Sequence, residues 1–264
     1  YSGGYPSKGD IAITGERIDG TVVHTNTVKP TRIFQDGINL WDFTTEDSGQ
    51  YRIKLEYNGY VLYSNTFTIT MAVCEHPGYD EYNKCSQCGC DLAAAIVKDG
   101  KTTGYVTFAE ALAAAQTDEN KDCTLRLLAN VKGTVDVDTG DFGIDLNGNI
   151  VGGLKVKKSA KVNISGGTIN GGVTVAKAAQ LTASNTLFAG AINCVGSGDF
   201  RNCIFMGAVS PKGGSSMKLN SCEINGELSV SGNAEADECI VSGTVTVNNG
   251  GSLKSAGGAY GNIV

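Results

Sequence analysis

Apolar residues recur along residues 105–264 in units of 17–19 residues. Each unit has an apolar start, and successive starts are separated by 19, 19, 19, 17, 19 and 17 residues. The starts are Val135, Leu154, Val173, Ile192, Val209, Leu228 and Val245. A repeat of this length with β-branched apolar positions and turn glycines is typical of a parallel β-solenoid, in which each unit forms one coil.

Three further positions keep a fixed distance from each start. Glycines lie two residues before it, at Gly133, Gly152, Gly171, Gly190, Gly207, Gly226 and Gly243. Apolar residues lie four before it, at Val131, Ile150, Ile169, Phe188, Phe205, Ile224 and Val241, and eight after it, at Val162, Leu181, Phe200, Met217, Ala236 and Leu253. The recurrent glycine marks a corner that needs a positive φ or a close approach of backbones. Leucine-rich and strict hexapeptide frames are absent, so we expect a right-handed parallel β-helix.

The N-terminal end of the predicted solenoid has its own pattern. Residues 107–116, "TFAEALAAAQ", place Phe108, Ala111, Leu112 and Ala115 on one face of a short amphipathic helix. A first coil has an unpaired edge and an open core, and we expect this helix to cover them. "CTLRLLANV" after it is predicted to form the first strand.

The first 72 residues alternate polar and apolar positions in short bursts. Strands are predicted at 11–14, 21–25, 39–43, 51–57, 60–64 and 66–70, with a hairpin turn at Asn58–Gly59. Asp47, Gly49 and Tyr51 have the spacing of the tyrosine corner of immunoglobulin-like sandwiches. The fold class is therefore all-β, with an Ig-like β-sandwich at 1–72, a Cys/His connector at 73–100 and the β-helix at 101–264. A full sandwich needs roughly 100 residues, so this one is short of strands or begins inside the domain.

Composition and charge narrow the partners. The formal net charge is −6 and no block of Lys and Arg exists, which argues against nucleic acid or an anionic membrane surface. The sequence has no run of about 18 apolar residues, so no membrane-spanning segment is predicted. The chain has no initiator Met and no signal peptide, and we expect it to be a segment of a larger protein whose other domains are its partners.

The connector holds the densest chemistry, in "CEHPGYDEYNKCSQCGC" at 74–90. Cys85 and Cys88 form a C-x-x-C-G knuckle, and Cys74 and His76 supply a second pair upstream. Three thiolates and one imidazole can complete a closed tetrahedral Zn²⁺ site, which leaves no position for a catalytic water. Disulfides are the alternative, with Cys90 and Cys123 as further partners. Cys90 is otherwise a bystander, or a substitute ligand if His76 points away.

The other cysteines belong to the repeat. Cys203, Cys222 and Cys239 share one column, and Cys194 falls in an inward column of valines. We expect all four to be reduced, buried thiols, although a disulfide between adjacent coils is geometrically possible. A catalytic thiol is disfavoured because no histidine follows His76 to activate it.

An enzymatic role has few candidate residues. Asp136 and Asp138 alternate with inward valines in "DVDTGDFGID" and could bind Ca²⁺ or act as a carboxylate pair, but a solvated strand face is the simpler interpretation. Phe142 and Tyr260 are the expected exposed aromatics. Coils of this length leave no room for loops that would wall a groove, and we predict no catalytic residue.

The helix at 107–116, "LRLLANV" and "DLNGNI" together resemble the β-helix modules of large surface proteins from Gram-positive gut bacteria. The resemblance covers about residues 74–264; with the Ig-like zone, it suggests an Ig-like module, a zinc-ribbon-like connector and a β-helix of pectin-lyase-like type. It implies an extracellular, cell-surface location. We therefore expect a non-catalytic stalk or adhesin-like surface that binds a glycan or a host protein. The alternative is a carbohydrate-active enzyme, a polysaccharide lyase or hydrolase, or its accessory module.

Overall fold

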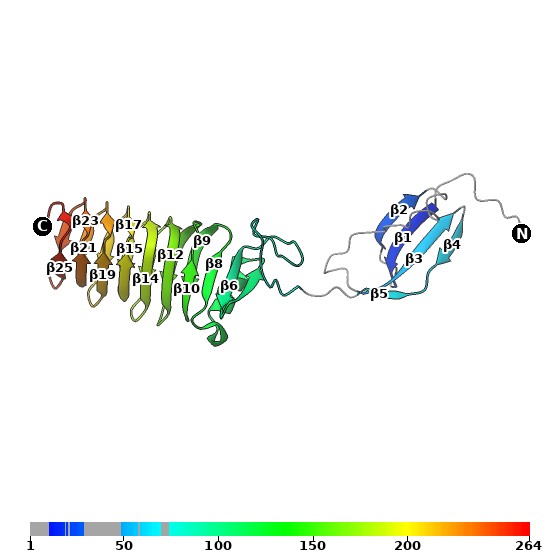
Figure 1. The fold of residues 1–264 in the computed structure, drawn as a ribbon, viewed down its shortest axis with the longest axis horizontal. Coiled ribbons are helices and arrows are strands. Elements are labelled where there is room, and N and C mark those ends of the chain that lie inside the picture. Colours follow the sequence, from blue (N-terminus) through cyan, green and yellow to red (C-terminus); the bar gives the residue numbers. More distant parts are fainter. Residues whose placement is uncertain (1–10, 19, 21, 29–48, 58, 70–73) are drawn as a thin grey trace, which may run out of the picture. The chain divides into compact units, whose positions relative to one another are not determined.

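The chain divides into two units, Tyr1–Val73 and Cys74–Val264, and each is described by itself. The structure is a computed structural model, and it describes residues 11–18, 20, 22–28, 49–57, 59–69 and 74–264. Both units are built of strands (Figure 1). Among the described residues, no helix is both long enough and apolar enough to cross a membrane.

The described part of the first unit is one antiparallel sheet with the strand order β2–β1–β3–β4, and β5 shares the edge of β3 with β4. Its strands are β1 (Ile11–Arg17), β2 (Val22–Val28), β3 (Gly49–Tyr57), β4 (Tyr60–Tyr63) and β5 (Phe67–Ile69). They confirm the predicted strands except the one at 39–43, which lies outside the described residues. The Asn58–Gly59 hairpin is confirmed, because Tyr57 pairs with Tyr60 and Gly59 has a φ of 80°.

Tyr51 is the centre of what this sheet buries. Its side chain is fully buried, stacks on Phe67 with ring centroids 6.4 Å apart, and lies 5.7 Å from the Arg17 guanidinium carbon. The described residues of the first unit form a single sheet, so the second sheet of an Ig-like sandwich is not shown. Asp47 lies outside the described residues, and the tyrosine corner stays a prediction.

The second unit is a β-solenoid whose coils stack side by side (Figure 1). Three parallel ladders run along it, and we call them the first, second and third faces. The first face consists of β8 (Thr124–Leu127), β10 (Asp141–Asp145), the N-terminal parts of β12 (Lys161–Ile169) and β14 (Gln180–Phe188), then β16 (Ser197–Arg201), β19 (Ser216–Asn220), β22 (Asn233–Asp237) and β25 (Ser252–Ala256).

The other two faces follow in each coil. The second face consists of the start of β11 (Ile150–Val156), the ends of β12 and β14, β17 (Ile204–Phe205), β20 (Glu223–Ile224), β23 (Ile240–Val241) and β26 (Ala259–Tyr260). The third consists of β9 (Val131–Val137), the end of β11, β13 (Val173–Val175), β15 (Ile192–Cys194), β18 (Val209–Pro211), β21 (Leu228–Val230) and β24 (Val245–Val247).

The predicted register of the coils is confirmed on the third face. Its seven starts pair in order, from Val135 with Leu154 to Leu228 with Val245. The handedness of the solenoid stays a prediction.

Two predicted columns need correction. Val151 rather than Ile150 is the inward residue: it is 2% exposed against 45%, because the register shifts between Val151 and Gly153. Phe200 pairs with Ala183, not with Leu181. Likewise Ala236 pairs with Leu219, not with Met217.

The second correction has a local cause. The turn between the third and first faces has four residues at 176–179 but two at 195–196, so a 17-residue coil is shortened there. A constant count from the coil start therefore overshoots by two residues. Gly198 takes the inward position instead, and a Cβ there would lie 2.6 Å from Cε2 of Phe200. The ring thus fills the space that Gly198 leaves.

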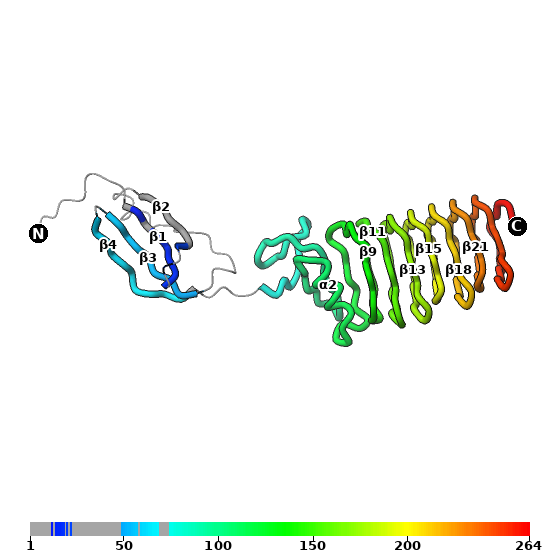
Figure 2. The backbone as a smooth tube through the Cα atoms, turned by 180° about the vertical axis from the view of Figure 1, so that it is seen from behind, coloured from blue at the N-terminus to red at the C-terminus, as the bar shows by residue number. Residues whose placement is uncertain are grey.

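The N-terminal end of the solenoid is capped by a helix. Helix α2 (Phe108–Ala115) covers the N-terminal end of the core, with Ala111 and Ala115 buried, as predicted (Figure 2). Thr107 caps it through a reciprocal capping box with Glu110. A short 3₁₀ turn, η2 (Asp118–Asn120), follows.

A hairpin that was not predicted precedes the helix. It consists of β6 (Ala94–Lys98) and β7 (Lys101–Tyr105), and β6 pairs with β8, so β7 is the outermost strand of the first face at this end. Asp99 and Gly100 form its turn with φ values of 50° and 74°. Asp-Gly between strands is a strong hairpin signal, and it was available in the sequence.

The glycine column is required by close backbone approach, not by positive φ. None of its members has a positive φ. A Cβ on Gly207 would lie 2.6 Å from the carbonyl carbon of Gly190 in the coil before, and the same collision recurs along the column. A Cβ on Gly133, at the beginning of the column, meets no atom within 4 Å.

We predict that Gly207→Ala lowers the free energy of unfolding by about 2–3 kcal/mol or more, because the coils must separate to admit the methyl group. Gly133→Ala is the matched control and changes stability by about 0.5 kcal/mol or less. Thermal and urea unfolding of the two variants measure this difference. Equal stability of the two variants would contradict the explanation of the column.

Candidate metal centre

The four predicted ligands lie together. One ligand atom from each of Cys74, His76, Cys85 and Cys88 falls within 4.8 Å of all the others. The Cys74 and Cys85 sulfurs are 3.5 Å apart, as are the Cys88 sulfur and Nδ1 of His76. A tetrahedron of metal–sulfur bonds of about 2.3 Å has edges of about 3.8 Å, so the donors fit one ion. The cluster could hold a metal ion.

The backbone around the cluster follows the pattern of a metal knuckle. The amide of Gln87 donates to the Cys85 sulfur at 3.4 Å, and the amide of His76 donates to the Cys74 sulfur at 3.4 Å. Gly89 has a φ of 75° and donates its amide to the carbonyl of Cys85. The amides of Gln87 and His76 stabilise negative charge on the two sulfurs to which they donate. Metal binding requires this charge because the thiolate is the ligand.

The segment packs on the solenoid cap. Cys85, Leu92, Ala95 and Leu128 form a small buried cluster that is separate from the main core. The amide of Gly104 in β7 donates to the carbonyl of His76 at 2.7 Å. The 74–90 segment therefore covers the edge of β7 at Gly104, whereas Lys101, Thr102 and Thr103 of the same strand line the cleft beside it.

Cys90 lies close to this cluster without completing it. Its sulfur is 3.4 Å from the sulfur of Cys88 and 3.6 Å from Nδ1 of His76. The backbone amide and the thiol of Cys90 lower the pKa of Cys88 to about 7, whereas burial and the neighbouring Cys88 raise the pKa of Cys90 to about 11. In the metal-free protein at pH 7, Cys88 is thus about half thiolate, whereas Cys90 remains a thiol.

The cleft beside the cluster is the second feature of this end. It has a volume of about 1150 Å³ and is lined by residues of the 75–79 segment, β7, Glu110 and Arg126. Arg126 donates from Nε to Asp145 at 2.8 Å and from Nη1 to the hydroxyl of Tyr79 at 3.3 Å. The metal segment forms one wall, so the shape of the cleft depends on its order.

The remaining predicted residues have ordinary roles. The Asp136 carboxylate accepts from Nζ of Lys157 at 2.7 Å, and Lys157 also lies 3.5 Å from Asp138. That hydrogen bond lowers the pKa of Asp136. The lysine occupies the carboxylates that a Ca²⁺ ion would need, and a Ca²⁺ site at this pair stays a prediction without support. Phe142 is buried, not exposed, and Tyr260 is half-buried with its hydroxyl on the carbonyl of Ala236, because both side chains turn into the solenoid.

The solenoid cysteines are buried thiols, as expected, and all nine cysteines are free. Cys203, Cys222 and Cys239 each donate to the carbonyl two residues before them, at 3.3 Å. Each follows a residue with a φ near 50°, which turns the chain from the first to the second face. Thr186 makes the same hydrogen bond one coil earlier. A small donor at this corner is what the column selects.

Comparison with protein-family models, with curated proteins and with solved structures found no match to this chain. The metal centre and the solenoid are therefore interpreted from their own geometry.

We predict that Cys90 replaces His76 when the imidazole is removed. His76→Ala loaded with Co²⁺ should keep tetrahedral d–d absorption, with a stronger sulfur-to-metal charge-transfer band, because a fourth thiolate enters. His76→Ala/Cys90→Ser should lose the tetrahedral spectrum, and Cys90→Ser alone should match the wild-type spectrum. If the double and single His76 variants have the same spectrum, Cys90 is not a substitute ligand.

Proposed function

We propose that this chain is a non-catalytic, metal-stapled segment of a bacterial cell-surface protein, which acts as a stalk or as an adhesin-like surface for a glycan or a host protein. In this proposal the N-terminal unit is an Ig-like sandwich, and the solenoid is a right-handed β-helix of the pectin-lyase-like type. The metal is structural Zn²⁺ in a zinc-ribbon-like connector. The location is extracellular.

The observation that carries this proposal is the brevity of the turns in the solenoid. From β12 onward, each connection between faces has two to four residues, such as 202–203, 206–208 and 212–215. An enzyme groove on a solenoid needs longer loops as walls, and the described solenoid has none. Parallel strands that pair along the whole unit instead give a stiff rod with flat, hydrogen-bonded faces.

Zinc is the metal that the donor set favours. Three thiolates and one imidazole form a closed tetrahedral set, which is typical of structural zinc. The site staples a segment whose own buried cluster is small, and it holds that segment on the edge strand β7. A metal at this position therefore stabilises the N-terminal end of the rod.

The enzyme alternative has weaker support. The pair Asp136 and Asp138 lies on the third face, and both carboxylates lie within ion-pair distance of Lys157. A general acid needs a raised pKa, whereas the lysine lowers the pKa of Asp136. These contacts suit a solvated structural ion pair.

We predict that the purified, reduced chain holds about one equivalent of zinc by elemental analysis. Cys85→Ser should lower its zinc affinity by at least about tenfold, because it removes a direct ligand. Mutation of residues that only hydrogen-bond to metal ligands already lowers metal affinity by about 10–100-fold. Ser86→Ala, at the exposed neighbouring position, should keep full occupancy. Less than about half an equivalent of zinc in the wild type would contradict the proposal.

We also predict that the chain releases no sugar from polysaccharides. Incubation with neutral and uronate polysaccharides should yield neither new reducing ends nor the ultraviolet absorbance of unsaturated uronates. Glycan and glycoprotein arrays should instead detect binding. Turnover that Asp136→Asn abolishes would overturn the non-catalytic proposal, and Asp199→Asn serves as the matched control, because Asp199 is an exposed-face carboxylate on another part of the solenoid.

A further inference from the structure

A polar hollow interrupts the first face near its N-terminal end. It has a volume of about 490 Å³ and lies over β8, β10, β12 and β14. This size falls within the range of about 300–1,000 Å³ that is usual for ligand sites. It is distinct from the cleft beside the metal centre, with which it shares no lining residue.

The hollow exists because small side chains point outward over four successive strands. One outward column of the first face reads Thr124, Gly143, Asn163 and Thr182 in its first four strands. In the next four strands, the same column reads Asp199, Lys218, Glu235 and Lys254. The lining of the hollow ends at β14, and charged side chains follow in this column from β16 onward.

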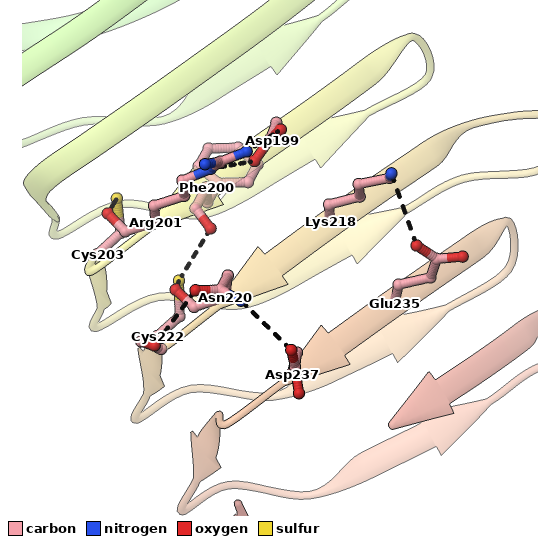
Figure 3. Close-up of polar contacts among 10 residues, drawn as sticks. Asp199, Phe200, Arg201, Cys203, Lys218, Asn220, Cys222, Glu235 and Asp237 are labelled. Carbon is pink, nitrogen blue, oxygen red and sulfur yellow. Dashed lines mark hydrogen bonds and ion pairs between the residues drawn. The ribbon is translucent and has the colours of Figure 1, made fainter. Parts of the chain in front are cut away.

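Figure 3 shows how the charged half of this face is occupied. Lys218 lies 3.8 Å from Glu235 in the next coil, and Arg201 lies 3.3 Å from Asp199 in its own strand. Asn220 donates to Asp237 at 3.4 Å. These charged side chains pair with one another, whereas a smaller hollow of about 240 Å³ lies beside them over β14, β16 and β19.

The polar groups of the hollow are not used in this way. Within the described chain, no hydrogen bond is made by the side chains of Thr124, Asn163, Ser165 or Thr182. Each can donate and accept. A ligand with many hydroxyl groups would match them.

Gly143 is the least explained residue of the strand that crosses the hollow. It lies in the middle of β10, where glycine costs stability relative to other residues. Its φ is not positive, and the nearest atom to an added Cβ would be Oγ1 of Thr124 at 3.5 Å, an ordinary contact. Neither conformation nor packing requires a glycine there. Its absent side chain keeps the hollow open, as glycine does where a ligand approaches a strand.

Charge selects among hydroxyl-rich ligands. The charged residues that line the hollow are all acidic: Asp122, Asp141 and Asp145. Lys161, 3.8 Å from Asp141, and Arg126, 2.8 Å from Asp145, compensate two of them from its edge. Asp122 is compensated by neither cation, so the lining keeps a net negative charge that disfavours uronates, sulfated sugars and other polyanions. The strand spacing of about 4.8 Å, close to the length of one sugar ring, suits a chain that runs across the strands.

We propose that this hollow binds a neutral oligosaccharide, whose hydroxyl groups pair with Asn163, Thr182 and the acidic rim over the floor that Gly143 leaves open. The inference rests on the proposed function, because it names the ligand class and its place on the binding surface. No aromatic ring lines the hollow except the buried Phe142, so hydrogen bonds rather than ring stacking would hold the sugar.

Gly143→Val tests the proposal because it fills the hollow while favouring the strand. Thermal unfolding should show that the variant is at least as stable as the wild type. Calorimetric titration with neutral hexasaccharides of β-linked glucose, mannose or galactose should show binding of at least one to the wild type, weakened at least about tenfold in the variant. Thr174→Val, on the third face, should bind as the wild type does. Asn163→Ala should weaken binding without destabilisation.

The other outcomes separate the two proposals. If Gly143→Val binds the sugar as tightly as the wild type, the hollow is not the site, although the proposed binding role stands. If the wild type binds hexagalacturonate or a pentalysine peptide but no neutral sugar, the ligand class is wrong. If the wild type cleaves the bound sugar, the site inference stands and the non-catalytic function fails.

Discussion

Direct stacking of backbone on backbone between neighbouring coils is the constraint on which the solenoid depends. At the corner before each coil start, the chain of one coil lies against the chain of the coil before, with no room for a Cβ at Gly207 or its equivalents. Because this contact recurs in every coil, the three faces stay in register from end to end. The apolar columns inside, such as Phe188 stacked 5.1 Å from Phe205, can then pack without gaps.

A rod built in this way has its weak points at its ends. Each end presents an open core and an unpaired strand edge, and both invite association with other chains. At the N-terminal end the two problems have separate solutions. Helix α2 covers the core, and the 74–90 segment covers the edge of β7 at Gly104, whose amide donates to the carbonyl of His76. The metal centre is thus part of the capping of the solenoid, and this gives a dense cluster of cysteines a structural reason.

Because the coils are so regular, we look for functional sites at the residues that depart from the repeat. Inward positions are constrained by stacking, and some outward positions of the first face in the C-terminal half pair across coils, such as Lys218 with Glu235 and Asn220 with Asp237. Departures from the pattern are therefore informative. Gly143, which neither backbone nor packing requires, marks a hollow of the first face that is lined by several unpaired hydroxyl and amide groups.

The sequence by itself determined the all-β character, the coil starts, the glycine column, the capping helix and the four residues of the candidate metal cluster. Each of these features depends on short-range spacing or on a period that repeats many times, so one irregular residue does not obscure the pattern. Only the tertiary structure decided where the 17-residue coils are shortened, which moved Phe200 and Ala236 by one inward position. The length of the repeat gives the number of residues in a whole coil, but it does not show which turn of the coil is two residues shorter. The contact of the 74–90 segment with β7 and the polar hollow could likewise not be predicted, because they join residues that only the tertiary fold brings together.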